Sequence, residues 1–236
     1  MSQDIPEIYA NYNSFRPEAS GSKTLCYFTR NMGALLEESK LGKDANILEI
    51  GPGKGELLNK LRGLGYSNLE AFDICASFRE NLRSQGFKVY DGNNLLDLLE
   101  QLPDNYFDAL IAVDVLEHID RLELQEFLKS FSCKLKSGGV IMGQVPNSSG
   151  LFGHNTFIAD YTHITPFNEI RLTSLFHGCG YKNILVRETR LPKSVGNFFR
   201  SIARNFIFKI AYFLNRLVGA TPVKNLSHLI LFHAEK

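Results

Sequence analysis

Short apolar runs alternate with amphipathic segments along most of the chain. Continuous apolar runs predict buried β-strands near residues 45–50, 69–73, 87–90, 108–113, 139–145, 182–188 and 228–234. Apolar residues at every third or fourth position predict helices near 22–39, 56–64, 76–85, 94–101 and 122–135. This alternation is typical of a doubly wound α/β fold with a mostly parallel sheet.

The length of 236 residues suits one such domain with a well-buried core, so we expect a single domain over 1–236. Residues 1–21 are either a lid over the site or a mobile terminus, and both readings stay open. The first residues lack a basic segment followed by an apolar core, and no uncharged apolar run reaches 18 residues. The four cysteines contain no C-x-x-C pair. We therefore expect free thiols and a cytoplasmic location.

The first predicted strand runs into Glu49-Ile-Gly-Pro-Gly-Lys-Gly-Glu56. Because glycine has no Cβ, the three glycines Gly51, Gly53 and Gly55 let the backbone turn sharply and approach a ligand closely. A dinucleotide site needs a further glycine at the position of Glu56, so NAD is not expected. The pattern predicts a different nucleotide-type cofactor at the carboxyl end of this strand.

This segment resembles the first motif of the class I S-adenosylmethionine (SAM)-dependent methyltransferases, which reads acid-x-Gly-x-Gly-x-Gly. Later segments are similar to further motifs of that family in the same order: 69–75, 107–119, 136–147 and 160–167. The resemblance implies a Rossmann-like, seven-stranded, mostly parallel sheet with an antiparallel last strand. It also implies S-adenosyl-L-methionine as the cofactor.

The cofactor residues follow from the resemblance, with an ordinary structural role as the alternative for each acid. Asp73 lies about 20 residues after the glycine loop, where an acid accepts both ribose hydroxyls, although it could also cap a helix. In the family, the acid at the position of Glu49 orients the methionyl amino group and the acid at the position of Asp91 accepts from adenine. Asp91 also begins a good turn. The remaining expected contacts are Gly51, Gly53, Gly55, Ile74, Asp114 and Val115.

Transfer to a hydroxyl requires alignment of the reacting atoms and removal of a proton. His163 and His118 both follow predicted strands, at the sheet edge where ligands bind. His163 is the candidate base, and the alternative role for His118 is to pack beside the cofactor. Either histidine could instead be structural. Asp160 would orient His163 or act on its own. Tyr161 and Tyr12 are candidate substrate contacts.

Motifs that are missing from the sequence reduce the number of possible methyl acceptors. The Asn/Asp-Pro-Pro-aromatic motif of methyltransferases that act on nucleobase and amide nitrogens is missing, since Val145-Pro-Asn147 occupies that region. Nucleic acid is therefore not expected, and neither is a metal, because nothing resembles the acidic cluster of the catechol group. We expect O-methylation of a sugar, glycan or small metabolite, with carbon or carboxyl methylation or a non-catalytic binding role as alternatives.

Charge is unevenly distributed along the chain. Residues 1–188 carry 18 basic and 24 acidic residues, net −6, whereas 189–236 carry eight basic residues and one acidic residue, net +7. Within this basic part, 193–218 predicts an amphipathic helix inserted before the last strand. Its Phe-rich face would pack on its own domain or on a second subunit as a homodimer. The alternative is a peripheral contact with the inner face of a membrane, which would suit a lipid-linked acceptor.

Overall fold

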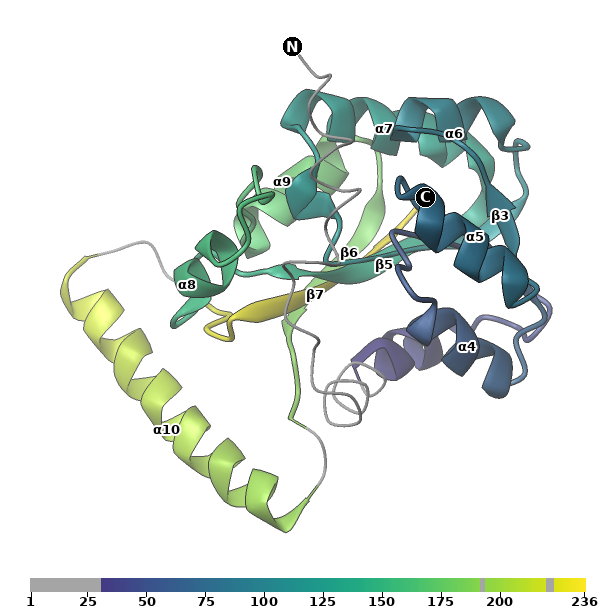
Figure 1. Cartoon of the computed structure of the whole chain (residues 1–236). Helices are drawn as coiled ribbons and strands as arrows, with labels where there is room; N and C mark the ends of the chain where they lie inside the picture. The colour runs from purple at the N-terminus through teal and green to yellow at the C-terminus, as the bar shows by residue number, and fades with distance from the viewer. Residues whose placement is uncertain (1–30, 192–193, 220–222) are drawn as a thin grey trace.

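The structure, a computed structural model, describes residues 31–191, 194–219 and 223–236. Its strands form one sheet in the order β3-β2-β1-β4-β5-β7-β6 (Figure 1). The strands are β1 (Asn46–Ile50), β2 (Asn68–Phe72), β3 (Lys88–Tyr90), β4 (Phe107–Val113), β5 (Leu135–Pro146), β6 (Lys182–Glu188) and β7 (Leu229–Glu235). β7 pairs antiparallel with β5 and β6, and the other neighbours pair parallel. The expected seven-stranded sheet with an antiparallel last strand is confirmed.

The helices include those predicted from the amphipathic pattern and two that were not predicted, at 153–158 and 169–178. They are α4 (Glu56–Gly63), α5 (Ala76–Ser84), α6 (Leu95–Gln101), the 3-10 turn η1 (Leu116–His118), α7 (Arg121–Lys134), α8 (Gly153–Ile158), α9 (Glu169–Gly178) and α10 (Val195–Leu217). Residues 31–39 are also helical, and the rest of the helix predicted near 22–39 lies outside the described residues. None of the helices in the described ranges is long and apolar enough to cross a membrane.

Helices cover both faces of the sheet (Figure 1). Helices α6, α7 and α9 pack on one face, and α4, α5 and residues 31–39 pack on the other. Alternate residues of the central strand β4 face opposite layers: Leu110 contributes to the first core and Ile111 to the second, and both are fully buried. A strand buried on both faces reads as a continuous apolar run, which is why β4 was visible in the sequence.

The topology brings the chemistry-bearing loops to one edge of the sheet. Strands β1 to β6 run in the same direction, so their carboxyl ends share an edge. Because β7 runs in the opposite direction, it begins at that edge, and its first residue Leu229 pairs with Pro146, the last residue of β5. The connection from β6 to β7, which contains α10, therefore leaves from and returns to the edge where ligands bind in such sheets.

Candidate functional site

The glycine loop between β1 and α4 turns through left-handed conformations. Gly51, Gly53 and Gly55 have φ values of 65°, 54° and 79°, which residues with a Cβ rarely adopt. A Cβ at Gly51 would lie 2.6 Å from Cγ2 of Val115, whereas a Cβ at Gly53 would meet no atom within 4 Å in the described structure. Gly51 is thus required by packing against Val115, while Gly53 borders open space that a ligand can use.

Asp73 ties this loop to the end of β2. Its carboxylate accepts hydrogen bonds from the backbone N–H of Gly53, at 3.1 Å, and from that of Cys75, at 2.8 Å. Burial raises the pKa of Asp73, and these two hydrogen bonds partly oppose the rise. Each carboxylate oxygen can accept a second hydrogen bond, so the side chain can still receive two hydroxyl groups. Ile74, the next residue, is partly buried against the core.

Glu49 lies at the end of β1 with 3% of its surface exposed. Burial, with a contribution from the negative charge of Asp73, raises the pKa of Glu49 to about 8. Its Oε2 atom has no hydrogen-bond partner among the residues that the structure describes. A buried carboxyl group without a partner is costly, and a cationic amino group would relieve that cost. Glu49 and the space beside Gly53 therefore fit a ligand with the ammonium group of SAM.

Asp91 is not brought into this group. Its side chain is 71% exposed and forms ion pairs with Arg83, at 2.7 Å, and with Arg79, at 3.4 Å. The hydrogen bond from Arg83 is the main cause that lowers the pKa of Asp91. A contact between this carboxylate and adenine, as expected from the sequence, would require it to leave Arg83.

Asp114 and Val115 follow β4 in an unusual turn. Asp114 has a φ of 52°, although it is not a glycine. Its carboxylate accepts from Nε2 of Gln144 on β5, at 3.1 and 3.3 Å, and its backbone N–H donates to the Gln144 carbonyl. The side chain of Asp114 is thus held on β5, and the turn places Val115 against Gly51. Strained backbone of this kind is common beside ligand sites.

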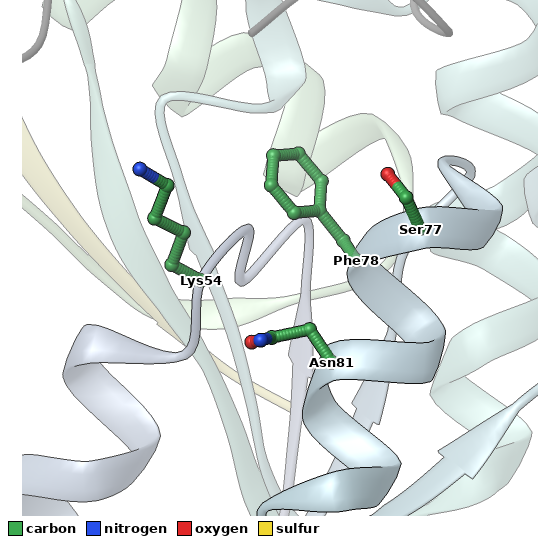
Figure 2. A pocket seen from close by; sticks show the side chains of 4 residues that line it. All are labelled: Lys54, Ser77, Phe78 and Asn81. Atoms are coloured by element: carbon green, nitrogen blue, oxygen red, sulfur yellow. The ribbon is translucent and has the colours of Figure 1, made fainter.

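A pocket of about 360 Å³ lies between the glycine loop and α5. Figure 2 shows that Lys54 comes from the loop, and that Ser77, Phe78 and Asn81 come from the helix that follows Asp73. The space thus separates the two elements that are expected to hold the nucleoside part of the cofactor.

A second group of side chains lies after β4 and β5. The rings of His118 and His163 have centroids 4.6 Å apart. Nδ1 of His163 lies 2.7 Å from the carbonyl oxygen of Phe157, which can only accept, so Nδ1 carries a proton. Nε2 of the same ring lies 3.7 Å from Oε1 of Glu117, whose side chain is 1% exposed. The structure thus joins two of the predicted residues to a buried carboxylate that the sequence analysis did not select.

Asp160 is linked to His118 through the hydroxyl group of Thr162. The Thr162 hydroxyl donates to Oδ1 of Asp160 at 2.6 Å, and Oγ1 of Thr162 lies 2.8 Å from Nδ1 of His118. Because the hydroxyl proton is already directed at Asp160, Nδ1 of His118 must be the donor in the second contact. Asp160 therefore orients His118 through Thr162, and its backbone carbonyl accepts from the N–H of His163.

Backbone hydrogen bonds fix the loop that carries His163. The N–H groups of Ile164 and Thr165 both donate to the Glu117 carbonyl at 2.9 Å. The only signals for Glu117 and Thr162 in the sequence were their positions next to the two histidines. Tyr161 is 91% exposed and does not line this group, and Tyr12 and the proposed lid over 1–21 lie outside the described residues.

Comparisons with known proteins agree with this geometry. A family profile described as "Methyltransferase domain" matches residues 23–186, which is well over half of the chain. Among solved structures, a SAM-dependent methyltransferase from Archaeoglobus fulgidus superposes with a TM-score of 0.69 and 23% identity, over 95% of this chain and 99% of the other. No curated protein matches the chain.

Two further structures share the fold at lower identity. Phosphoethanolamine N-methyltransferase 2 from Haemonchus contortus, solved with SAM, has a TM-score of 0.59 and 14% identity over 98% of this chain and 56% of the other. An O-methyltransferase family protein from Burkholderia thailandensis has a TM-score of 0.57 and 13% identity over 88% and 56%. Since their names include both nitrogen and oxygen acceptors, the shared fold does not identify the acceptor atom.

The sheet order, the glycine loop and the acids at the carboxyl ends of β1 and β2 define a SAM-dependent methyltransferase. The chain belongs to the methyltransferase domain family whose profile it matches.

We expect Asp73→Ala to weaken SAM binding about 100-fold or more, because two hydrogen bonds from ligand hydroxyls to a carboxylate are lost. Asp91→Ala is the matched control: it should change the dissociation constant less than about threefold, because its carboxylate is occupied by Arg83. Calorimetric titration with SAM measures both values, and circular dichroism checks the fold. Equal losses in the two variants would contradict this assignment.

SAM binding should release a proton from Glu49. The raised pKa, about 8, keeps this carboxyl protonated near neutrality in the free protein, and pairing with an ammonium group requires the ionised form. Affinity should therefore increase between about pH 6 and about pH 7.5. Titrations in buffers of different ionisation enthalpy measure the released proton, which should vanish in Glu49→Gln. An unchanged proton count in that variant would exclude Glu49 as the source.

Proposed function

We propose that this methyltransferase acts on a hydroxyl oxygen of a sugar, glycan or other small metabolite. The observation that supports this proposal is the group formed by Glu117, His118 and His163 beside the cofactor loop. Two of these residues lie in η1, which begins directly after Val115, and Val115 packs at Gly51. A hydroxyl is a weak nucleophile until its proton is removed, and this group is suited to that task.

The chain's residues then divide between two ends of one site. Glu49 binds the methionyl ammonium group, Asp73 the ribose hydroxyls, and the backbone around Asp114 and Val115 lies beside the methionyl part. When bound, SAM supplies a sulfonium methyl group that an acceptor oxygen takes as the C–S bond breaks and its electron pair passes to sulfur. Most of the catalysis is alignment, which a rigid loop and strand ends provide.

At the acceptor end, the side chains are fixed before the substrate arrives. The His163 side chain is 8% exposed, and its Nδ1–H is held by the Phe157 carbonyl. His118 is held by the Thr162 and Asp160 pair. Both rings are therefore fixed in orientation, and the acceptor hydroxyl is deprotonated beside this group.

We expect His163→Ala to lower kcat by about 10²- to 10⁴-fold on a hydroxyl acceptor, while the dissociation constant for SAM changes less than about threefold. His154→Ala is the control, since His154 is an exposed histidine on α8. Formation of S-adenosylhomocysteine with a panel of sugars and small hydroxyl compounds measures turnover, and mass spectrometry locates the methyl group. A product methylated on carbon or carboxylate, with His163→Ala fully active, would refute the proposal.

The acceptor, we further propose, is presented at an anionic membrane surface on the cytoplasmic side, with α10 as the contact. No residue of this 23-residue helix is buried. The expected packing of its Phe-rich face on the domain is wrong for the described residues. Nine large apolar side chains are 45% to 79% exposed: Val195, Phe198, Phe199, Ile202, Phe206, Ile210, Phe213, Leu214 and Leu217.

The opposite face of α10 points toward the rest of the protein. Its half-buried positions recur three or four residues apart: Asn197, Ser201, Arg204, Phe208, Ala211 and Asn215. Arg204 donates from NH1 to the Thr189 carbonyl at 3.1 Å and so attaches the helix to the segment after β6. In Figure 1, α10 lies apart from the layers that cover the sheet. The helix thus presents its apolar face outward, the reverse of a helix packed on a core.

Charge favours lipid as the occupant of that face. The exposed charged residues of α10 are Arg200, Lys209 and Arg216, and the helix contains no acidic residue. Anionic lipids of the cytoplasmic leaflet attract such residues, and an interfacial helix inserts its aromatic face beside them. Two copies joined through this face would instead bring like charges together. Since α10 connects strand ends at the ligand edge, a membrane beneath it would lie near the site.

We expect the protein to sediment with vesicles that contain anionic phosphatidylglycerol, and at least about tenfold more weakly with neutral phosphatidylcholine vesicles. Phe206→Ser with Phe213→Ser should reduce binding more than about tenfold, because two exposed rings lose their apolar contact. Leu122→Ser, at a 78% exposed residue of α7, is the matched control. A dimer that stays in the supernatant, and that the double variant dissociates, would contradict the membrane contact.

A further inference from the structure

One ligand atom from each of Glu117, His118 and His163 lies within 4.8 Å of the other two. We propose that these side chains bind a divalent transition-metal ion that holds the acceptor oxygen. The inference deepens the proposed hydroxyl methylation and rests on it. Two imidazoles and one carboxylate form a ligand set that leaves coordination positions open for a substrate.

The distance between His163 and Glu117 suits two ligands of one metal ion better than a hydrogen bond between them. Nε2 of His163 and Oε1 of Glu117 are 3.7 Å apart, whereas a charge-assisted hydrogen bond between such groups is about 2.7 to 2.9 Å long. Two ligands that each lie about 2.1 Å from one ion can be up to about 4.2 Å apart. The 3.7 Å pair is therefore already within reach of one ion. The ligand atoms of the group lie within 4.8 Å of one another, so its widest pair would move closer on binding an ion.

Both imidazoles are oriented as metal ligands usually are, with the second ring nitrogen donating to a fixed acceptor. Nδ1–H of His163 donates to the Phe157 carbonyl, and Nδ1–H of His118 donates to Thr162, whose own proton is directed at Asp160. The hydrogen bonds fix both ring planes, and the contact at Nδ1 of His163 makes Nε2 the coordinating atom of that ring.

The burial of the group supports the same role. The side chains of Glu117 and His163 are 1% and 8% exposed, so few water molecules compete for the position between them. A cation there would lower the pKa of a bound hydroxyl, whose proton would pass to solvent and leave the oxygen as the nucleophile. Two nitrogen ligands favour Mn²⁺, Fe²⁺ or Zn²⁺ over Mg²⁺ or Ca²⁺, which prefer oxygen ligands.

This inference differs from the metal-free site expected from the sequence. That expectation rested on the missing acidic cluster of another methyltransferase group. The ligands proposed here come from two segments 45 residues apart, η1 and the loop after α8. Hydrogen bonds from Ile164 and Thr165 to the Glu117 carbonyl, from the Thr165 hydroxyl to the Ile119 carbonyl and between His118 and Thr162 bring these segments together.

The test is a titration of the chelator-treated full chain with Mn²⁺ alone, followed by electron paramagnetic resonance of the free ion. We expect one site per chain. His163→Ala and His118→Ala should each weaken Mn²⁺ binding more than about tenfold, and Thr162→Val about tenfold through loss of ring orientation. His154→Ala, an exposed histidine, should leave the affinity unchanged. SAM titration of every variant verifies that the cofactor site is intact.

Absence of a Mn²⁺ site, or equal binding by wild type and His163→Ala, would overturn the proposal and leave an ion pair only. Full methyl transfer by chelator-treated protein in the presence of EDTA would overturn it as well. Neither result bears on hydroxyl methylation, which is read from the product. Conversely, a Mn²⁺ site lost in both histidine variants, together with methylation of carbon or carboxylate, would retain the metal and refute the hydroxyl acceptor.

Discussion

The carboxylate of Asp73 links the elements on which the cofactor site depends. One oxygen accepts from Gly53 in the loop after β1, and the other accepts from Cys75 at the start of α5. These contacts hold the loop in its left-handed turns without any side chain from the loop itself. A buried carboxylate raises the free energy of the folded protein unless donors surround it. Here backbone N–H groups supply part of that compensation, and ligand hydroxyls would supply the rest.

The acceptor end depends on a different kind of contact, between loops that follow neighbouring strands. β4 and β5 pair in parallel, so the turn after β4 and the segment after β5 emerge at the same edge. Hydrogen bonds to the Glu117 carbonyl then fix the distance between the two segments. Thr162 bonds to both Asp160 and His118 and so holds the His118 ring in place. Each histidine consequently has its Nδ1 committed to a structural hydrogen bond. Preorganisation of this kind reduces the reorganisation required during reaction.

Helix α10 keeps its large apolar side chains on the surface of the protein. Burial of its Phe-rich face would have been favourable by about 1.5 to 3 kcal/mol for each large side chain. The chain nevertheless attaches the helix through Arg204 and the half-buried, mostly polar face that contains it. An exposed face of this size marks an interaction site rather than a packing defect. Its position between two strand ends at the ligand edge supports the proposed contact close to the acceptor site.

The strands, the glycine loop and the helices on the sheet other than α9 were predicted from the sequence, because apolar periodicity and glycine spacing are local properties of the chain. Asp73 was found by its spacing, but the engagement of Asp91 with Arg83 was not, since an acid after a strand looks the same in either role. Amphipathicity revealed α10, yet not which face points outward. Tertiary structure alone decided that Glu117 lies with His118 and His163. It also decided that Asp160 is linked to His118 through Thr162. Backbone contacts between segments distant in sequence set these distances.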